Sequence, residues 1–190
     1  WDEDFRALTA DLRRRLLALL GPTSDALECV PVQGSGTFGV EAMLGTFLPH
    51  NGKVLVLSNG AYGLRAAEAV RYLGRRFSVI DKGDYLPPRG KDVSAAIAAD
   101  PAITHVMAIH CETSSGILNP LAEIAAATEA AGRKLLIDSM SAFGAIDLRP
   151  DEIPFEAVVS SANKCIEGVP GFSFVLARRD ALKAAKDNAH

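Results

Sequence analysis

Lys164 is the residue in this sequence best suited to covalent chemistry. It lies within Ser160–Cys165 and is followed closely by Gly168, Pro170 and Gly171, a composition typical of a loop. A lysine in such a loop can be partly desolvated, and desolvation favours the neutral amine that Schiff-base formation requires. An ordinary surface lysine fits the same pattern, so this segment alone leaves both interpretations open.

Asp138 is the second candidate, because it follows an apolar segment, Lys134–Ile137, that is predicted to be a buried strand. A carboxylate at the tip of a buried strand costs free energy unless a group there requires negative charge. That group can be a metal ion, a ribose hydroxyl or a protonated ring nitrogen. A carboxylate that caps the following turn is the alternative interpretation.

Gly34–Thr37 combines two glycines and two hydroxyls between a predicted strand and a predicted helix. Glycine lets the backbone approach an anion closely, and the first N–H groups of a helix favour negative charge. Ser35, Gly36 and Thr37 are therefore candidates for a phosphate-binding turn, although a capped glycine-rich turn without a ligand has the same sequence. The spacing does not match G-x-G-x-x-G and the P-loop lysine is missing, which disfavours a dinucleotide or ATP site.

Tyr62 lies at the start of a predicted helix, where its ring can stack on a flat ligand or pack against its own helix. His110 and Cys111 are adjacent, which invites comparison with a Cys/His nucleophile. Neighbouring residues of a strand point to opposite faces, however, and this makes the pair a poor dyad.

The elements that position these residues alternate along the chain. Helical periodicity indicates helices over 2–20, 40–47, 61–74, 92–99, 120–131 and 179–185, and apolar runs indicate strands over 27–32, 53–57, 76–80, 104–110, 134–138, 157–160 and 172–177. Strands that are apolar throughout are buried on both faces. The predicted fold class is therefore α/β, a three-layer sandwich with a mainly parallel sheet and one antiparallel strand near the end.

The carboxyl ends of parallel strands meet at one edge of such a sheet, and ligands bind there. The phosphate-binding turn, the aromatic ring, the strand-end carboxylate and the loop lysine all follow predicted strands. Together they are the four groups that a pyridoxal 5′-phosphate site requires.

Composition restricts the remaining function classes. The chain has 190 residues, 48% of them apolar, and 20 basic against 23 acidic residues give a net charge of −3. These values favour one cytoplasmic domain and give no sign of nucleic-acid or membrane partners. Three widely spaced cysteines predict reduced thiols and no metal site. Since the chain starts at Trp1 without a methionine, we expect a piece of a longer protein.

Five segments carry a resemblance that covers essentially the whole chain: VPVQGSGTFGVEA, LSNGAYGLRAAEA, HCETSSGILNPL, LLIDSMSAFGA and SSANKCIEGVPGF. In order and spacing they resemble the class V aminotransferases of the type I pyridoxal-phosphate fold. The last segment favours the branch that moves the amino group of 2-aminoethylphosphonate to pyruvate. Alanine–glyoxylate and serine–pyruvate transaminases share the framework and remain the alternative.

The resemblance implies a role for each site residue. Lys164 would bond to the cofactor and move the substrate proton, and Asp138 would pair with the pyridinium nitrogen. Tyr62 would stack on the ring at a position that is often Trp in relatives, and Thr113 would reach the ring hydroxyl. Ser35, Gly36 and Thr37 would hold the phosphate, with Asn163 as an additional contact.

The resemblance also implies the context of the chain. Residues 1–190 would be the cofactor-binding large domain, inactive or nearly so alone, and a smaller C-terminal domain would follow. An amine and a 2-oxo acid would be the substrates, with no metal. The arginine that grips the phosphonate would lie outside this chain, and relatives are homodimers that share residues between active sites.

Overall fold

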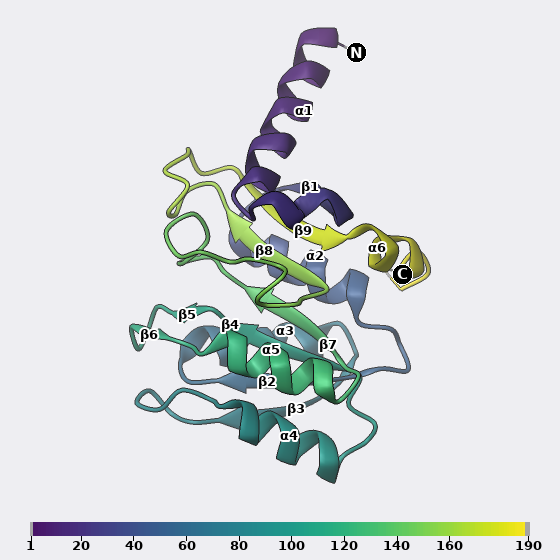
Figure 1. Cartoon of the computed structure of the whole chain (residues 1–190), viewed down its shortest axis with the longest axis vertical. Coiled ribbons are helices and arrows are strands. Elements are labelled where there is room, and N and C mark those ends of the chain that lie inside the picture. The colour runs from purple at the N-terminus through teal and green to yellow at the C-terminus, as the bar shows by residue number, and fades with distance from the viewer. Residues whose placement is uncertain (1, 189–190) are drawn as a thin grey trace.

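A seven-stranded sheet forms the middle layer of the structure, a computed structural model that describes residues 2–188 (Figure 1). The strands are β1 (Leu27–Gln33), β2 (Lys53–Ser58), β3 (Arg76–Asp81), β4 (His105–Ile109), β7 (Lys134–Asp138), β8 (Ala157–Ser161) and β9 (Phe172–Arg178), in the spatial order β1-β9-β8-β7-β4-β2-β3. β9 is antiparallel to both of its neighbours, and the other adjacent pairs are parallel. This confirms the predicted sheet with one antiparallel strand near its end.

Helices cover both faces of the sheet. They are α1 (Glu3–Ala18), α2 (Gly36–Phe47), α3 (Ala61–Tyr72), α4 (Gly90–Ala99), α5 (Leu121–Ala130) and α6 (Arg179–Ala184). Figure 1 shows α4 and α5 in front of the sheet and α2 and α3 behind it, with the N-terminal part of α1 projecting beyond the other elements. The three-layer prediction is therefore confirmed.

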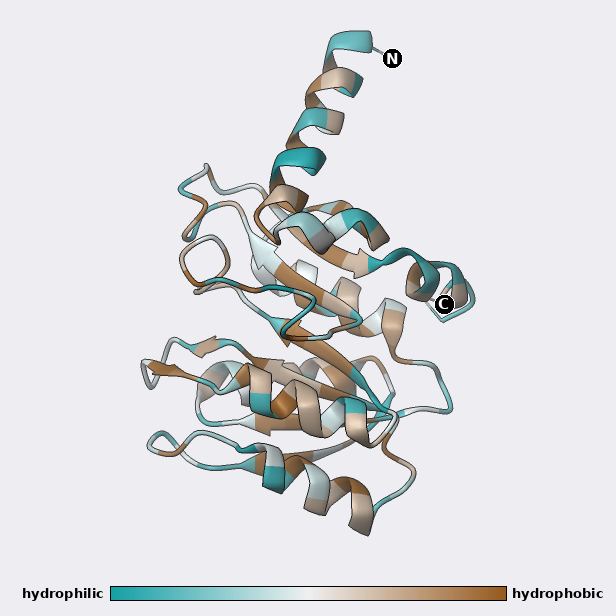
Figure 2. Cartoon of the chain, in the orientation of Figure 1, coloured by the Kyte–Doolittle hydropathy of each residue, from teal (hydrophilic) through white to brown (hydrophobic). Residues whose placement is uncertain are grey.

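Alternate residues of each strand enter different cores, as the two-residue period of a strand requires. In β2, Val54 and Val56 pack in the cluster of α2 and α3, whereas Leu55 and Leu57 pack in the cluster of α4 and α5. All four side chains are almost completely buried. The strands of Figure 2 are accordingly brown along most of their length, because both faces are covered.

Two short elements were not among the predictions. A hairpin of β5 (Cys111–Glu112) and β6 (Ile117–Leu118) follows β4, and a 3₁₀ helix, η1 (Pro22–Ala26), precedes β1. Each is too short to show a hydrophobic period.

The predicted helix over 92–99 begins two residues earlier, at Gly90. The Asp92 carboxylate accepts a hydrogen bond from the Arg89 N–H at 2.9 Å and so caps the helix at this earlier start.

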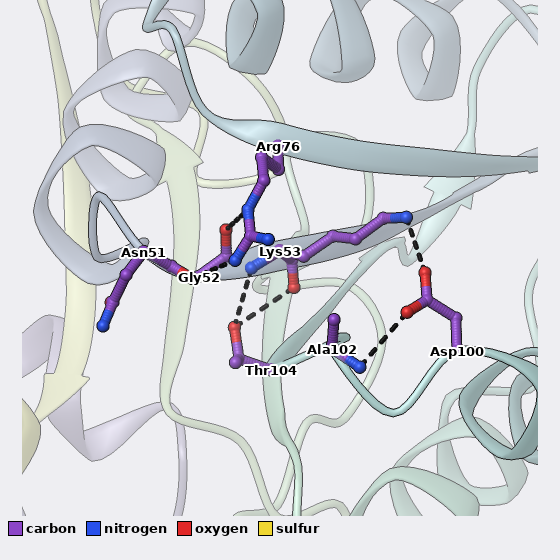
Figure 3. Close-up of polar contacts among 7 residues, drawn as sticks. All are labelled: Asn51, Gly52, Lys53, Arg76, Asp100, Ala102 and Thr104. Carbon is purple, nitrogen blue, oxygen red and sulfur yellow. Dashed lines mark hydrogen bonds and ion pairs between the residues drawn. The ribbon is translucent and has the colours of Figure 1, made fainter.

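Polar groups at the amino ends of the strands bond to one another (Figure 3). Lys53 Nζ lies 2.5 Å from the Asp100 carboxylate, and the Thr104 hydroxyl donates to the Lys53 carbonyl at 3.1 Å. Arg76 donates to the carbonyls of Asn51 and Gly52. These contacts tie together the starts of β2, β3 and β4.

Two glycines of α2 should respond in opposite ways to replacement by alanine. A Cβ at Gly39 would lie 2.7 Å from Ser173 Oγ and 2.8 Å from Val159 Cγ2, whereas at Gly45 the nearest atom is at 3.7 Å. We expect Gly39→Ala to destabilise the fold by about 1–3 kcal/mol through overpacking. Gly45→Ala should stabilise it by about 0.5–1 kcal/mol, because alanine has the higher helix propensity. Urea denaturation of both variants measures this difference, and equal effects would contradict the packing of α2 against β8 and β9.

Candidate active site

A cavity of about 470 Å³ lies at the carboxyl ends of the parallel strands. Every residue predicted for the site lines it. These residues come from the N-cap and first turn of α2, the first turn of α3, the β5–β6 turn, the end of β7 and the loop after β8: Ser35, Gly36, Thr37, Tyr62, Thr113, Asp138, Asn163 and Lys164. The fold thus brings together groups that are far apart in the sequence, as the strand-end rule predicts.

Asp138 is a buried carboxylate with an incomplete set of hydrogen bonds. The residue is 5% exposed, and Oδ1 accepts the Met140 N–H at 2.9 Å. No other residue in the range 2–188 donates a hydrogen bond to this carboxylate. Burial raises the pKa of Asp138 to about 6, against the opposing effects of the Met140 N–H and of Lys164. A cationic or N–H group in the cavity would meet an acceptor here.

The backbone around Asp138 is held by buried polar groups. Its carbonyl accepts the His110 N–H at 2.7 Å, and His110 Nδ1 lies 2.9 Å from the Ser139 hydroxyl. The Ser160 hydroxyl donates to the Ser139 carbonyl at 3.2 Å. Burial lowers the pKa of His110 to about 4, so the imidazole is neutral at pH 7. These bonds fix the end of β7 without adding a charge beside the carboxylate.

His110 and Cys111 are separated by the sheet geometry, as predicted. Cys111 lines the cavity, whereas the His110 ring is buried against Ser139. The structure therefore gives no support to a Cys/His nucleophile.

The turn before α2 borders the cavity. Ser35 is the N-cap residue of α2, and its own side chain makes no capping hydrogen bond to the first turn. A Cβ at Gly36 would lie 2.7 Å from Met140 Sδ, so a larger residue there would displace the flexible end of the Met140 side chain. Gly34 has a φ of 116° and donates its N–H to the Gly171 carbonyl at 3.0 Å, which anchors the turn. Such a helix start binds anions.

Tyr62 is placed so that both interpretations of its ring, as a surface for a flat ligand and as a side chain packed beside its own helix, apply. Its ring lines the cavity and also packs against the cluster between α2 and α3. The Arg65 guanidinium lies 5.1 Å from the ring centroid, within the range of a cation–π contact. In the β5–β6 turn, the Thr113 hydroxyl lies 2.6 Å from the Ser141 hydroxyl.

Lys164 lines the cavity together with Asp138, as predicted. It is exposed, so of the two interpretations that its segment left open, the structure has the exposed lysine and not the partly desolvated one. The physical reason is its loop, in which Asn163 and Glu167–Gly171 are exposed too.

Sequence reasoning missed several residues of the site. Ser141 and Arg65 line the cavity, and Glu112 bonds to the first turn of α3. All three lie in the five segments that carry the family resemblance, but the short hairpin that orients Glu112 gives no periodic signal in the sequence.

In the part of the chain that the structure describes, no group of three or more His, Cys, Asp or Glu side chains is arranged to hold a metal ion. None of the helices between residues 2 and 188 has the length and apolar character to cross a membrane.

The family model that matches this sequence and two of its relatives are named as aminotransferases or transaminases. The sequence model of the family "Aminotransferase class-V" matches residues 8–189. A 2-aminoethylphosphonate–pyruvate transaminase of Rhizobium meliloti (strain 1021) is 65% identical over 190 residues, which is all of this chain and 50% of that protein. A second one, of Paraburkholderia xenovorans (strain LB400), is 62% identical over all of this chain and 49% of that protein. The chain thus spans about half the length of these relatives.

Solved structures share the fold at lower sequence identity. Pyridoxamine-pyruvate aminotransferase from Mesorhizobium loti superposes with a TM-score of 0.90 at 24% identity, over 100% of this chain and 48% of that one. Alanine–glyoxylate aminotransferase from Nostoc sp. gives a TM-score of 0.89 at 21% identity, over 100% and 49%. At these identities the likeness concerns the fold alone.

Proposed function

Because this chain belongs to the class V aminotransferase family, we propose that it is the cofactor-binding large domain of a pyridoxal-phosphate-dependent transaminase for 2-aminoethylphosphonate and pyruvate. The products would be phosphonoacetaldehyde and alanine. The observation that carries the proposal is a lysine, Lys164, and a buried aspartate, Asp138, on one cavity that also contains an uncapped helix start. The names of the relatives at 65% and 62% identity support the choice of substrates.

The described residues fit pyridoxal phosphate at both of its ends. The Asp138 carboxylate, with one bonded oxygen, suits a protonated ring nitrogen, and the first turn of α2 suits a phosphate. Ser35, Gly36 and Thr37 would hold that phosphate, with Asn163 beside them. When bound, the cofactor supplies a ring that accepts the electron pair left on the substrate carbon after proton removal.

The protein side of the chemistry follows from these positions. Lys164 would hold the cofactor covalently through Nζ, and after its displacement by the substrate amine its neutral Nζ would take and return the substrate proton. Asp138 would keep the ring nitrogen protonated, which maintains the electron sink. Tyr62 would stack on the ring, and Thr113 would bond to the ring hydroxyl.

Assembly and location belong to the same proposal. We expect a homodimer in which the neighbouring subunit completes the site, and an arginine outside these 190 residues that binds the phosphonate. A cytoplasmic location is consistent with free thiols at Cys29, Cys111 and Cys165.

Competition between amino donors tests the function. The intact protein that contains this chain, loaded with pyridoxal phosphate, should form alanine from pyruvate when 2-aminoethylphosphonate is supplied, with a kcat/KM at least about 100-fold above that for serine. A preference for serine, or for alanine with glyoxylate as acceptor, would favour the other class V transaminases. Failure of borohydride to trap the cofactor on Lys164 would instead indicate a module without this chemistry.

A further inference from the structure

Glu112 is a buried carboxylate that the chemistry proposed above does not use. Its side chain is 0% exposed, and no lysine, arginine or histidine of residues 2–188 forms an ion pair with it. Its oxygens accept backbone hydrogen bonds instead: Oε2 accepts the N–H groups of Tyr62 and Gly63, both at 3.1 Å. Oε1 accepts the Ser114 N–H at 3.2 Å and the Ser114 O–H at 2.8 Å. A buried charge of this kind needs such donors.

The helix that receives these bonds has no cap of its own. The N-cap residue of α3 is Gly60, and no side chain of its own segment bonds to the first turn. The β5–β6 hairpin supplies the cap, because the Ser114 hydroxyl accepts the Ala61 N–H at 2.9 Å while Glu112 accepts the next two. Negative charge at this end of a helix is also favoured by the helix dipole.

Gly60 allows the hairpin to come this close. It has a φ of 157°, and a Cβ there would lie 2.4 Å from Ser114 Oγ and 2.6 Å from Glu112 Cγ. Any larger residue would push the hairpin away from the helix.

The two elements joined in this way both carry cavity residues. Tyr62, whose own N–H bonds to Glu112, lines the cavity from α3, and Thr113, which lies between Glu112 and Ser114, lines it from the hairpin. We propose that Glu112 is a positioning residue of the cofactor site, which fixes the Tyr62 ring relative to the Thr113 hydroxyl by capping α3 from the hairpin. The inference rests on the proposed function, which places both residues against pyridoxal phosphate.

Glu112→Gln in the intact protein tests the inference. Both carboxylate oxygens face N–H donors, so the amide nitrogen of glutamine would meet a donor in either orientation. We expect the apparent dissociation constant of pyridoxal phosphate, titrated into cofactor-free protein by visible absorbance, to rise about tenfold. The matched control is Glu123→Gln: the Glu123 carboxylate accepts the Gly90 N–H at 2.9 Å and so caps α4 from α5, away from the cavity. The control should change the constant by less than about twofold.

A double-mutant cycle separates positioning from other effects. In a Tyr62→Ala background, Glu112→Gln should weaken cofactor binding by less than about threefold, because the ring it positions is absent. A full tenfold effect in that background would overturn the inference and assign the loss to the negative charge of Glu112, which also raises the pKa of Asp138. If Glu112→Gln does not fold, Ser114→Ala removes one capping acceptor and should give about a threefold loss with the same dependence on Tyr62.

The remaining outcomes are distinguishable. Wild-type protein that binds pyridoxal phosphate while Glu112→Gln binds it equally well would overturn the positioning role alone. Wild-type protein that does not bind the cofactor at all would overturn the proposed function and this inference with it. Faster hydrogen exchange of the Tyr62 and Gly63 amides in cofactor-free Glu112→Gln is expected, and unchanged exchange would contradict the cap.

Discussion

Lys164→Arg is expected to lower kcat for transamination by at least about 10³-fold, since the variant would lose both the covalent link and the proton carrier that we propose for this lysine. Arginine keeps the positive charge near Asp138, so the loss would report the missing neutral amine and not a changed net charge. Single-turnover measurements with 2-aminoethylphosphonate would follow the cofactor absorbance directly. The fold should be unaffected, because Lys164 is exposed in its loop.

Lys134→Arg is the matched control for this variant. Lys134 is also exposed, but it begins β7 at the opposite edge of the sheet from the cavity. Its replacement should leave kcat within about twofold of wild type. Substantial activity in Lys164→Arg, or added methylamine failing to restore any activity to Lys164→Ala, would contradict the role assigned to Nζ.

Asp138→Asn is expected to have opposite effects on activity and on stability. It should lower kcat by about 10²–10³-fold, because a neutral amide would not keep the cofactor's ring nitrogen protonated in the way that we propose for Asp138. In cofactor-free protein at pH 7 it should raise the free energy of unfolding by about 3 kcal/mol, since it removes a buried charge. Asparagine can still accept the Met140 N–H that Asp138 accepts.

The pH dependence of this stabilisation follows from the direction of the shift. The pKa of Asp138 is raised from 3.8 to about 6, chiefly by burial. The folded state therefore holds this proton more tightly than the unfolded chain, and ionisation destabilises the fold as the pH rises from about 4 to about 6. Urea denaturation should give the full difference between Asp138→Asn and wild type above pH 6, and almost none near pH 4.

Asp92→Asn is the control of opposite sign. The hydrogen bond with Lys82 is the main cause that lowers the pKa of Asp92, so its charge stabilises the fold at neutral pH. Its replacement should reduce stability at pH 7. If Asp138→Asn is also less stable than wild type at pH 7, burial of an unpaired charge is the wrong description of the site.

The sequence was sufficient to locate the parts of the site that directly follow a predicted strand. Asp138 and the Gly34–Thr37 turn could be placed because short, mainly apolar segments at 27–32 and 134–137 locate the strand ends, and parallel strands bring their ends together. Asp138 and this turn line one cavity because the order and direction of the strands place both strand ends at the same edge of the sheet. Thr113 and Asn163 also lie in polar segments that follow predicted strands, but only the resemblance gave each of them a role.

Other features depend on tertiary contacts that leave no local signal. The β5–β6 hairpin has two residues in each strand, so the capping role of Glu112 could not be read from periodicity. The exposure of Lys164 was also unpredictable, because the composition of a loop does not reveal whether another element covers it. Family membership was correctly identified from the five segments, since it depends on order and spacing along the whole chain.

The pairing of β1 with β9 has a consequence for biosynthesis. β1 forms the edge of the sheet and is joined to it through β9, the last strand of this chain to leave the ribosome. The nascent polypeptide therefore carries the Gly34–Thr37 turn long before that turn has a scaffold, and ribosome-bound chains that stop short of Phe172 should not yet order it. Since such distant pairings form slowly, this segment is where molecular chaperones would have the longest time to act.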